Sequence, residues 1–135
     1  MIQKEKCIVC DIDGTLCPTK RADQSYADLI PYPAMAAQLR AYKEAGFTII
    51  LHTARNMRTH EGNIGLINAN TAKFTLAWLD QHQIPYDEIH FGKPWQGRGG
   101  FYVDDNTIRP DEFLNLSYEE IQTLLAGCRP QEESP

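Results

Sequence analysis

The chain has 135 residues, of which 42% are hydrophobic, and eighteen acidic against thirteen basic residues give a net charge of −5. This length and composition fit one globular domain and exclude a largely disordered chain. The acidic balance argues against a general nucleic-acid-binding protein, which would be basic. No segment approaches the roughly 20 apolar residues that span a membrane. The first residues also lack the apolar run of a signal peptide, so we expect a cytoplasmic protein.

The hydrophobic pattern predicts strands that alternate with helices. A segment over 17–32 has no clean period and is expected to form a loop or flap. The segment over 54–70 is predicted to be a long loop, because glycines and asparagines interrupt any helical pattern. In chain order, strands are expected over 7–11, 47–51, 87–91 and 99–103, and helices over about 33–45, 71–84 and 117–127.

This alternation predicts an α/β fold, a doubly wound parallel sheet covered by helices, in a single domain over 1–128. The tail over 129–135 is expected to fray. In such folds ligands bind outside the carboxyl ends of the strands. The polar residues that follow the predicted strand ends are Asp11, Asp13, Thr53, Lys93, Asp104 and Asp105.

Neighbouring carboxylates at one edge of a sheet repel each other unless a cation binds between them. An oxygen-only ligand set without cysteine or histidine suits Mg²⁺ better than Zn²⁺. Thr53 and Lys93 then supply a hydroxyl and a positive charge for phosphate oxygens. Asp11 is the natural nucleophile, and Asp13 can act as general acid and base. The predicted chemistry is therefore phosphoryl transfer, with Gly14 allowing the sharp turn that aims Asp13.

The C-x-x-C pair Cys7 and Cys10 does not compete with this interpretation. Positions three apart in a strand point to opposite faces, so the two thiols cannot chelate one ion. We expect these two cysteines to be reduced, buried and structural, and we expect no disulfides in the chain.

Four motifs resemble those of the haloacid dehalogenase (HAD) superfamily of phosphohydrolases, in the same order along the chain. They are Asp11-Ile12-Asp13-Gly14-Thr15-Leu16, Ile50-Leu51-His52-Thr53-Ala54-Arg55, Gly92-Lys93-Pro94 and Val103-Asp104-Asp105-Asn106. The resemblance implies an aspartyl-phosphate on Asp11, with Asp13 as acid and base and Thr53 and Lys93 on the phosphoryl group. It also implies Mg²⁺ held by Asp11, the main-chain carbonyl of Asp13 and the Asp104/Asp105 pair.

The gaps between the motifs are too short for a cap domain, so the chain resembles a capless member with an open site. Such a site suits a large substrate, or it is closed by the 54–70 loop, by the 17–32 flap or by a neighbouring subunit of a homo-oligomer. The residues expected to bind substrate are Gly14, Thr15, Ala54, Arg55, Arg58, His60 and Asn63. Around Thr53 and Asp104 the chain resembles phosphatase-like proteins of capsular polysaccharide biosynthesis, which implies a small phosphorylated sugar or polyol as substrate.

Two other functions stay open. A phosphatase for protein or nucleic-acid ends also suits an open site, although the net charge of −5 argues against nucleic acid. A non-catalytic phospho-acceptor module of the receiver type combines similar residues, but there the acidic pair comes early and the lysine last. Asp13 would also shorten the life of an acyl-phosphate, which favours turnover over signalling.

Overall fold

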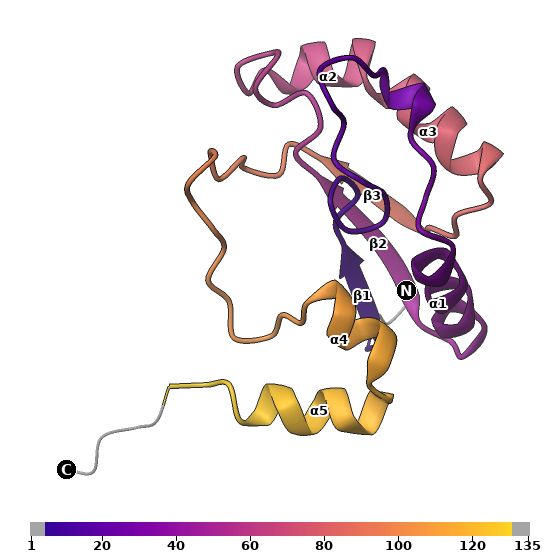
Figure 1. The fold of residues 1–135 in the computed structure, drawn as a ribbon, viewed down its shortest axis with the longest axis vertical. Helices are drawn as coiled ribbons and strands as arrows, with labels where there is room; N and C mark the ends of the chain where they lie inside the picture. Colours follow the sequence, from indigo (N-terminus) through magenta and orange to yellow (C-terminus); the bar gives the residue numbers. More distant parts are fainter. Residues whose placement is uncertain (1–4, 131–135) are drawn as a thin grey trace. The chain divides into compact units, whose positions relative to one another are not determined.

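A three-stranded parallel sheet organises the chain as far as Trp95 (Figure 1). Its strands are β1 (Cys7–Cys10), β2 (Thr48–Thr53) and β3 (Glu88–Phe91), in the order β1-β2-β3. The pairing aligns Cys10 with Leu51 and Thr53 with Phe91, so the carboxyl ends of the strands lie along one edge. The prediction of an α/β fold with a parallel sheet flanked by helices is confirmed. The computed structural model describes residues 5–130.

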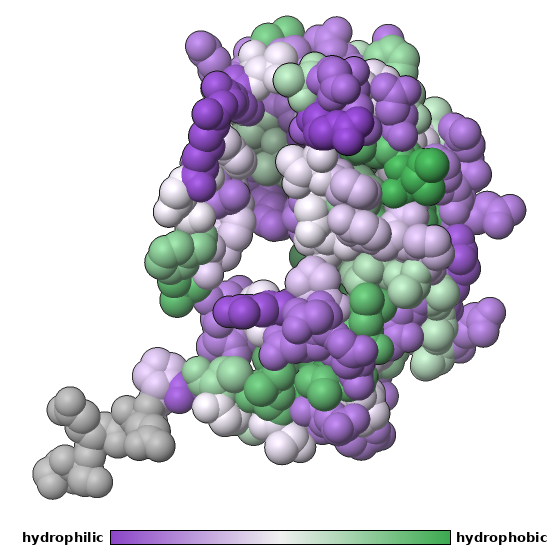
Figure 2. All heavy atoms as spheres, viewed as in Figure 1, coloured by the Kyte–Doolittle hydropathy of each residue, from purple (hydrophilic) through white to green (hydrophobic). Residues whose placement is uncertain are grey.

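The connections between these strands are helical. A short 3₁₀ helix, η1 (Tyr26–Asp28), precedes α1 (Pro33–Glu44), and two consecutive helices, α2 (Ile64–Asn70) and α3 (Ala72–Gln81), join β2 to β3. Proline suits the first position of α1 because it has no N–H to leave unpaired there. The outer surfaces of α2 and α3 mix polar and apolar residues (Figure 2), and Phe74 is 67% exposed.

The core lies between β2 and the helices. Ile49 and Leu51 of β2 are fully buried together with Leu39 of α1, Ile67 of α2 and Leu79 of α3. Burying each such side chain contributes roughly 1.5–3 kcal/mol. Burial alternates along β2, and Thr53 continues the buried face to the end of the strand. The packing that holds the sheet therefore also anchors the residue that begins the candidate site.

The long loop predicted over 54–70 is wrong in its second half, where α2 forms. The side-chain oxygen of Asn63 accepts a hydrogen bond from Leu66 N at 3.1 Å and caps the helix. Asparagine is among the best N-cap residues, so Asn63 followed by Ile64 was a usable start signal. Glycine and asparagine inside α2 weaken its intrinsic propensity, but burial of Ile67 compensates for them.

Residues from Gln96 onward form a second compact unit, which contains α4 (Pro110–Asn115) and α5 (Tyr118–Ala126). The helix expected from Ser117 is confirmed, and the Ser117 hydroxyl accepts from Glu120 N at 3.2 Å. The sequence analysis missed α4, although Pro110 at its first position with Asp111 and Glu112 behind it is a typical helix start.

The strand predicted over 99–103 is wrong. Residues 99–103 have no strand assignment, and Phe101 and Val103 are 81% and 89% exposed. The apolar run that suggested a strand follows Gly99 and Gly100, which lack side chains to pack and lose much backbone entropy when they are ordered. The single domain over 1–128 and the tail over 129–135 stay predictions. Residues 131–135 of that tail lie outside the described range.

The cysteines follow their strand positions. Cys7 is exposed and Cys10 is buried, as expected for thiols three residues apart in β1, and all four cysteines are free thiols. The expectation that both thiols of the C-x-x-C pair are buried is therefore wrong for Cys7. Cys17 is buried and Cys128 is exposed. Within residues 5–130, no helix has the length and apolar character needed to cross a membrane.

Candidate functional site

The turn after β1 presents two carboxylates from a rigid backbone. The carbonyl of Ile12 accepts hydrogen bonds from Thr15 N at 3.2 Å and Leu16 N at 2.8 Å, and both Ile12 and Leu16 are fully buried. Gly14 has a φ of +85°, and a Cβ there would lie 3.2 Å from the Thr19 hydroxyl. Only glycine adopts this conformation at little cost. The backbone on both sides of Asp13 is therefore tightly constrained.

Asp11 lies beside a positive charge from another strand. Lys93, which follows β3, places its Nζ 3.6 Å from Oδ1 of Asp11, and the Thr15 hydroxyl donates to Oδ2 at 3.2 Å. The Asp11 and Lys93 side chains are 30% and 19% exposed, so they are reachable from solvent but partly shielded. An ammonium beside a carboxylate can hold an anionic group close to that carboxylate.

Thr53 ends β2 and is 1% exposed. Its main-chain carbonyl accepts from Lys93 N at 3.1 Å, and its hydroxyl accepts from Arg55 N at 3.0 Å. The ends of β2 and β3 are therefore tied together at the point where Lys93 begins. The structure brings Asp11, Thr15, Thr53 and Lys93 to the same edge of the sheet.

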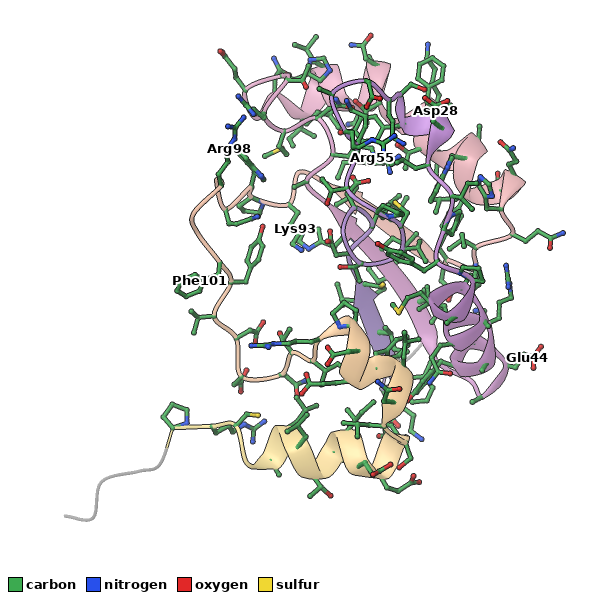
Figure 3. The ribbon with its side chains drawn as sticks, in the orientation of Figure 1. Asp28, Glu44, Arg55, Lys93, Arg98 and Phe101 are labelled. Carbon is green, nitrogen blue, oxygen red and sulfur yellow. The ribbon has the colours of Figure 1, made fainter. Side chains whose placement is uncertain are left out.

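Arg55 is buried rather than displayed on a loop. Its side chain is 1% exposed and forms a two-pronged ion pair with Asp13, whose side chain is 21% exposed. Nε donates to Oδ2 at 3.0 Å and Nη2 donates to Oδ1 at 2.7 Å. Arg55 lies beside η1 (Figure 3), with its guanidinium 4.2 Å from the centre of the Tyr26 ring. The substrate-binding role assigned to Arg55 stays a prediction, but this guanidinium already has a carboxylate partner.

The sequence analysis missed the aromatic partners of Arg55. The Trp78 ring centre lies 5.5 Å from the guanidinium, and Trp78 Nε1 donates to the carbonyl of Leu29 at 2.8 Å. The helical period placed Trp78 in the core, but it could not show that Arg55 shares that environment. Tyr26 lies in a segment without periodicity, so no sequence signal pointed to it.

The other predicted substrate-binding residues lie between β2 and α2. Arg58 is exposed and stacks over the Trp95 ring at 5.6 Å, while Ala54 and His60 are half-buried. His60 N donates to the carbonyl of Asn56 at 3.0 Å. Arg58 of this connection thus contacts an exposed aromatic ring that follows β3, since Trp95 is 43% exposed.

Asp104 and Asp105 belong to the second unit and are exposed. The hydrogen bond from Asn106 N to Asp104 Oδ1, at 3.2 Å, holds the pKa of Asp104 below its usual value. Arg129 Nε donates to Asp105 Oδ2 at 3.3 Å. The predicted Mg²⁺ ligands are therefore divided between the two units. Among residues 5–130, no three His, Cys, Asp or Glu side chains are clustered for metal binding, so this ligand set stays a prediction.

Burial shifts the pKa of three further titratable groups near the strand ends in the direction that favours their neutral forms. Desolvation raises the pKa of Cys10 to about 12 and that of Cys17 to about 12. Thiols with such values stay protonated at neutral pH and are poor nucleophiles. Desolvation, reinforced by Lys93, lowers the pKa of His52. Among these neighbours of the site, Asp11 is the better nucleophile candidate.

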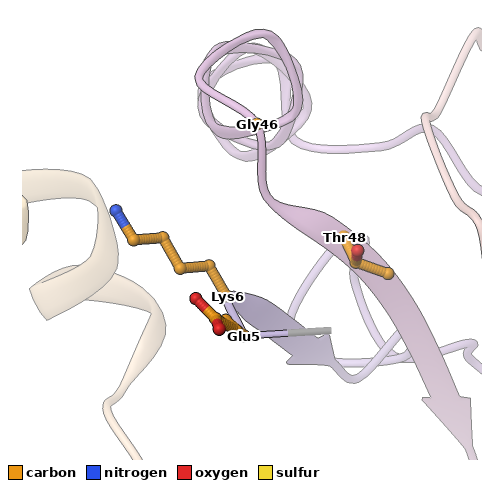
Figure 4. Close-up of a pocket in the computed structure, with 4 residues that line it drawn as sticks. All are labelled: Glu5, Lys6, Gly46 and Thr48. Atoms are coloured by element: carbon orange, nitrogen blue, oxygen red, sulfur yellow. The ribbon is translucent and has the colours of Figure 1, made fainter. Parts of the chain in front are cut away.

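An open hollow lies at the opposite end of the sheet. It is lined by Glu5, Lys6, Gly46 and Thr48, at the amino ends of β1 and β2 (Figure 4). It contains none of the predicted site residues. In parallel α/β sheets ligands bind at the carboxyl ends, so we place the candidate site at the other edge.

Comparison with known proteins finds similar solved structures. The sequence matches no protein-family model and no curated protein. The crystal structure of an MCSG target from Vibrio cholerae is 48% identical, with a TM-score of 0.85, covering 90% of this chain and 97% of that chain. A D,D-heptose 1,7-bisphosphate phosphatase from B. bronchiseptica, crystallised with magnesium and phosphate, is 23% identical with a TM-score of 0.46, covering 70% of this chain and 53% of that chain. The second similarity is distant and partial.

Proposed function

We propose that this chain, which belongs to the same family as the Vibrio cholerae protein, hydrolyses phosphate monoesters through an aspartyl-phosphate on Asp11. The pairing of Asp11 with Lys93 at 3.6 Å carries this proposal. It joins a nucleophile to a phosphate-binding cation at the edge where parallel sheets bind ligands. The order of the four sequence motifs supports the same chemistry.

In the first step, an Asp11 oxygen attacks the phosphorus of the bound ester. The bond from phosphorus to the leaving oxygen breaks, and Asp13, which must enter this step protonated, donates its proton to that oxygen. Lys93 and the Thr53 hydroxyl hold the phosphoryl oxygens, whose negative charge needs stabilisation during the transfer. The alcohol leaves, and Asp11 carries the phosphoryl group as a mixed anhydride.

In the second step, water attacks the phosphorus of the aspartyl-phosphate. Asp13, now ionised, accepts a proton from that water, and the bond from phosphorus to Asp11 breaks. Inorganic phosphate leaves, and both carboxyl groups return to their starting states. One residue thus serves as acid and then as base, which requires its position to be held through both steps.

Mg²⁺ dependence is part of the proposal. The carboxylate of Asp11 and those of Asp104 and Asp105 are hard oxygen ligands of the kind that Mg²⁺ prefers. When bound, the ion would neutralise charge on the phosphoryl group. Asp13 would contribute its main-chain carbonyl, because its carboxylate is held by Arg55.

We propose a phosphorylated sugar or polyol, a precursor of surface polysaccharide, as the substrate. Trp95, two positions after Lys93 in the chain, offers an aromatic face, and Arg58 places a cation over its ring. Arginine recognises anionic oxygens, and aromatic faces pack against the apolar faces of small molecules. Closure of the site by a second copy of the chain stays a prediction.

The test compares the chain with Asp11→Asn on a panel of phosphorylated sugars and polyols, with and without a chelator. We expect phosphate release by the unaltered chain, its loss in the chelator, and its recovery when Mg²⁺ is restored. Asp11→Asn should release none, because an amide is not a nucleophile here. Asp80→Asn is the matched control, since Asp80 is exposed near the end of α3, which leads to the amino end of β3, and it accepts only from the Tyr86 hydroxyl among the contacts described. Full activity of Asp11→Asn would contradict the mechanism.

A further inference from the structure

Arg55 is the charged side chain whose burial the proposed chemistry does not yet explain. The residue is 3% exposed, and it lies two positions beyond the end of β2. Arginine is almost never fully buried unless it is paired. Its partner here is Asp13, with two hydrogen bonds of 2.7 and 3.0 Å, one to each carboxylate oxygen. Two parallel bonds fix the plane of a carboxylate, which a single bond leaves free to rotate.

The guanidinium itself is held from its flat face. Tyr26 lies 4.2 Å below it and Trp78 lies 5.5 Å away, both within the range of cation–π contacts. Trp78 is fixed in turn by its bond to the Leu29 carbonyl at 2.8 Å. Two elements therefore hold the guanidinium of Arg55: the connection that contains η1, and helix α3. Through Arg55 they also hold the carboxylate of Asp13.

The main chain of Arg55 adds a second link. Its N–H donates to the Thr53 hydroxyl at 3.0 Å, while its side chain holds Asp13. One residue thus sets the spacing between a group proposed to bind the phosphoryl oxygens and a group proposed to transfer the proton. The Asp13 side chain is 21% exposed, so part of it is reachable from solvent.

We infer that Arg55 is a positioning residue that orients Asp13 for proton transfer, and that it does not contact substrate. This inference rests on the proposed function. Proton transfer needs heavy atoms within hydrogen-bond reach, so a freely rotating Asp13 would lose much of the 10²–10⁴-fold that a general acid typically contributes. Loss of Arg55 should therefore slow hydrolysis most for the substrates whose leaving oxygen needs protonation.

The experiment compares two phosphate esters that differ in leaving group. An alkyl phosphate, such as glycerol phosphate, needs its leaving oxygen protonated, whereas a nitrophenyl phosphate has a leaving group stable as an anion. The value of kcat/KM reports the steps up to departure of the leaving group. Arg55→Ala should lower kcat/KM for the alkyl ester on the order of 100-fold and for the aryl ester by only a few-fold. Added guanidinium should restore part of the loss for the alkyl ester.

Two further variants separate positioning from folding. Tyr26→Leu keeps the ion pair but removes the aromatic ring next to it. It should also lower kcat/KM more for the alkyl ester than for the aryl ester, but by smaller factors than Arg55→Ala. Arg40→Ala is the matched control, because Arg40 is exposed and donates to the His82 and Gln83 carbonyls away from the site. It should leave both esters unchanged. If Arg55→Ala fails to fold, Arg55→Lys and Tyr26→Leu still report the pattern.

The outcomes distinguish this inference from the function on which it rests. An unaltered chain that hydrolyses neither ester would overturn both. The unaltered chain could instead be active while the Arg55 and Tyr26 variants lose kcat/KM by equal factors on the two esters. That result would overturn the inference alone, because the two residues would then support the site as a whole. A larger loss on the aryl ester, or no loss on either, would also overturn it.

Discussion

Cys10 and Cys17 lie next to the proposed catalytic carboxylates, and burial decides their chemistry. The Cys10 thiol donates to the Asp11 carbonyl at 3.2 Å, and the Cys17 thiol lies 3.6 Å from an Asp13 oxygen. Desolvation, with the neighbouring negative charges, raises the pKa of each thiol from 9.0 to about 12. Both groups therefore stay neutral and pack as small apolar side chains beside the site.

These raised values predict a loss of stability in alkali. Below pH 9 the thiol of Cys10 is protonated in both the folded and the unfolded chain. As the pH rises from 9.0 toward about 12, the unfolded thiol loses its proton and the folded one does not, so unfolding becomes more favourable. Between these two pKa values, each such thiol makes the free energy of unfolding fall by about a further 1.4 kcal/mol per pH unit.

Denaturant unfolding at several alkaline pH values measures this effect. Cys10→Ala should show a shallower fall than the unaltered chain, and Cys7→Ala, a change at an exposed position of the same strand, is the matched control. Comparing slopes removes the separate cost of the cavity that the alanine leaves. Identical slopes for all three proteins would contradict the burial of Cys10 in its neutral form.

At the scale of elements, the connection between β2 and α3, which begins the candidate site, is more ordered than its sequence suggested. Two left-handed residues, Asn56 with a φ of 62° and Glu61 with a φ of 51°, turn the chain before α2 begins. The Asn56 side chain accepts from the Thr71 hydroxyl at 2.9 Å, which ties the turn to the junction of α2 and α3. The segment is thus an ordered turn followed by a capped helix.

Asn63 is predicted to stabilise this connection through its cap. Asn63→Ala should lower the free energy of unfolding by about 1 kcal/mol, because Leu66 N loses its acceptor. Asn63→Asp keeps an acceptor and should retain most of the stability. Asn68→Ala, an exposed change inside α2, is the matched control and should stay within about 0.5 kcal/mol. An equal loss for Asn63→Ala and Asn68→Ala in denaturant unfolding would argue against the cap.

Local signals in the sequence predicted the regular elements well. Apolar runs before Asp11 and Thr53 located β1 and β2, and the alternation of Ile89 and Phe91 with polar residues located β3. The Ser117 capping box located α5. Failures came where one local signal was taken alone: an apolar run after glycines suggested a strand over 99–103, and scattered glycines hid α2.

The site could be predicted from the topology of the parallel sheet, which places strand ends but not the side chains of irregular segments. Parallel strands bring their carboxyl ends to one edge, so the proximity of Asp11, Thr53 and Lys93 could be expected without any alignment. The pairing of Arg55 with Asp13 could not, since it depends on how the connection after β2 folds back beneath the turn after β1. Side-chain direction in irregular segments has no periodic signature in sequence.

At the scale of the whole molecule, the proposed function requires an acidic chain to bind an anionic substrate. The net charge of −5 disfavours general attraction of phosphate esters. Recognition therefore has to be local, through Lys93 at the end of β3 and through a cation that offsets the carboxylates. The proposal of Mg²⁺ dependence and the loss of activity expected in a chelator follow from this balance.

Trapping the covalent intermediate tests the central claim most directly. Asp13→Asn removes the base that activates water, so an aspartyl-phosphate formed from a nitrophenyl phosphate should accumulate. Acid quenching, proteolysis and mass spectrometry should then find one added phosphoryl group on the peptide that contains Asp11, and none in the Asp11→Asn protein. Phosphate released by an active chain without any such adduct, or an adduct on another residue, would contradict the account.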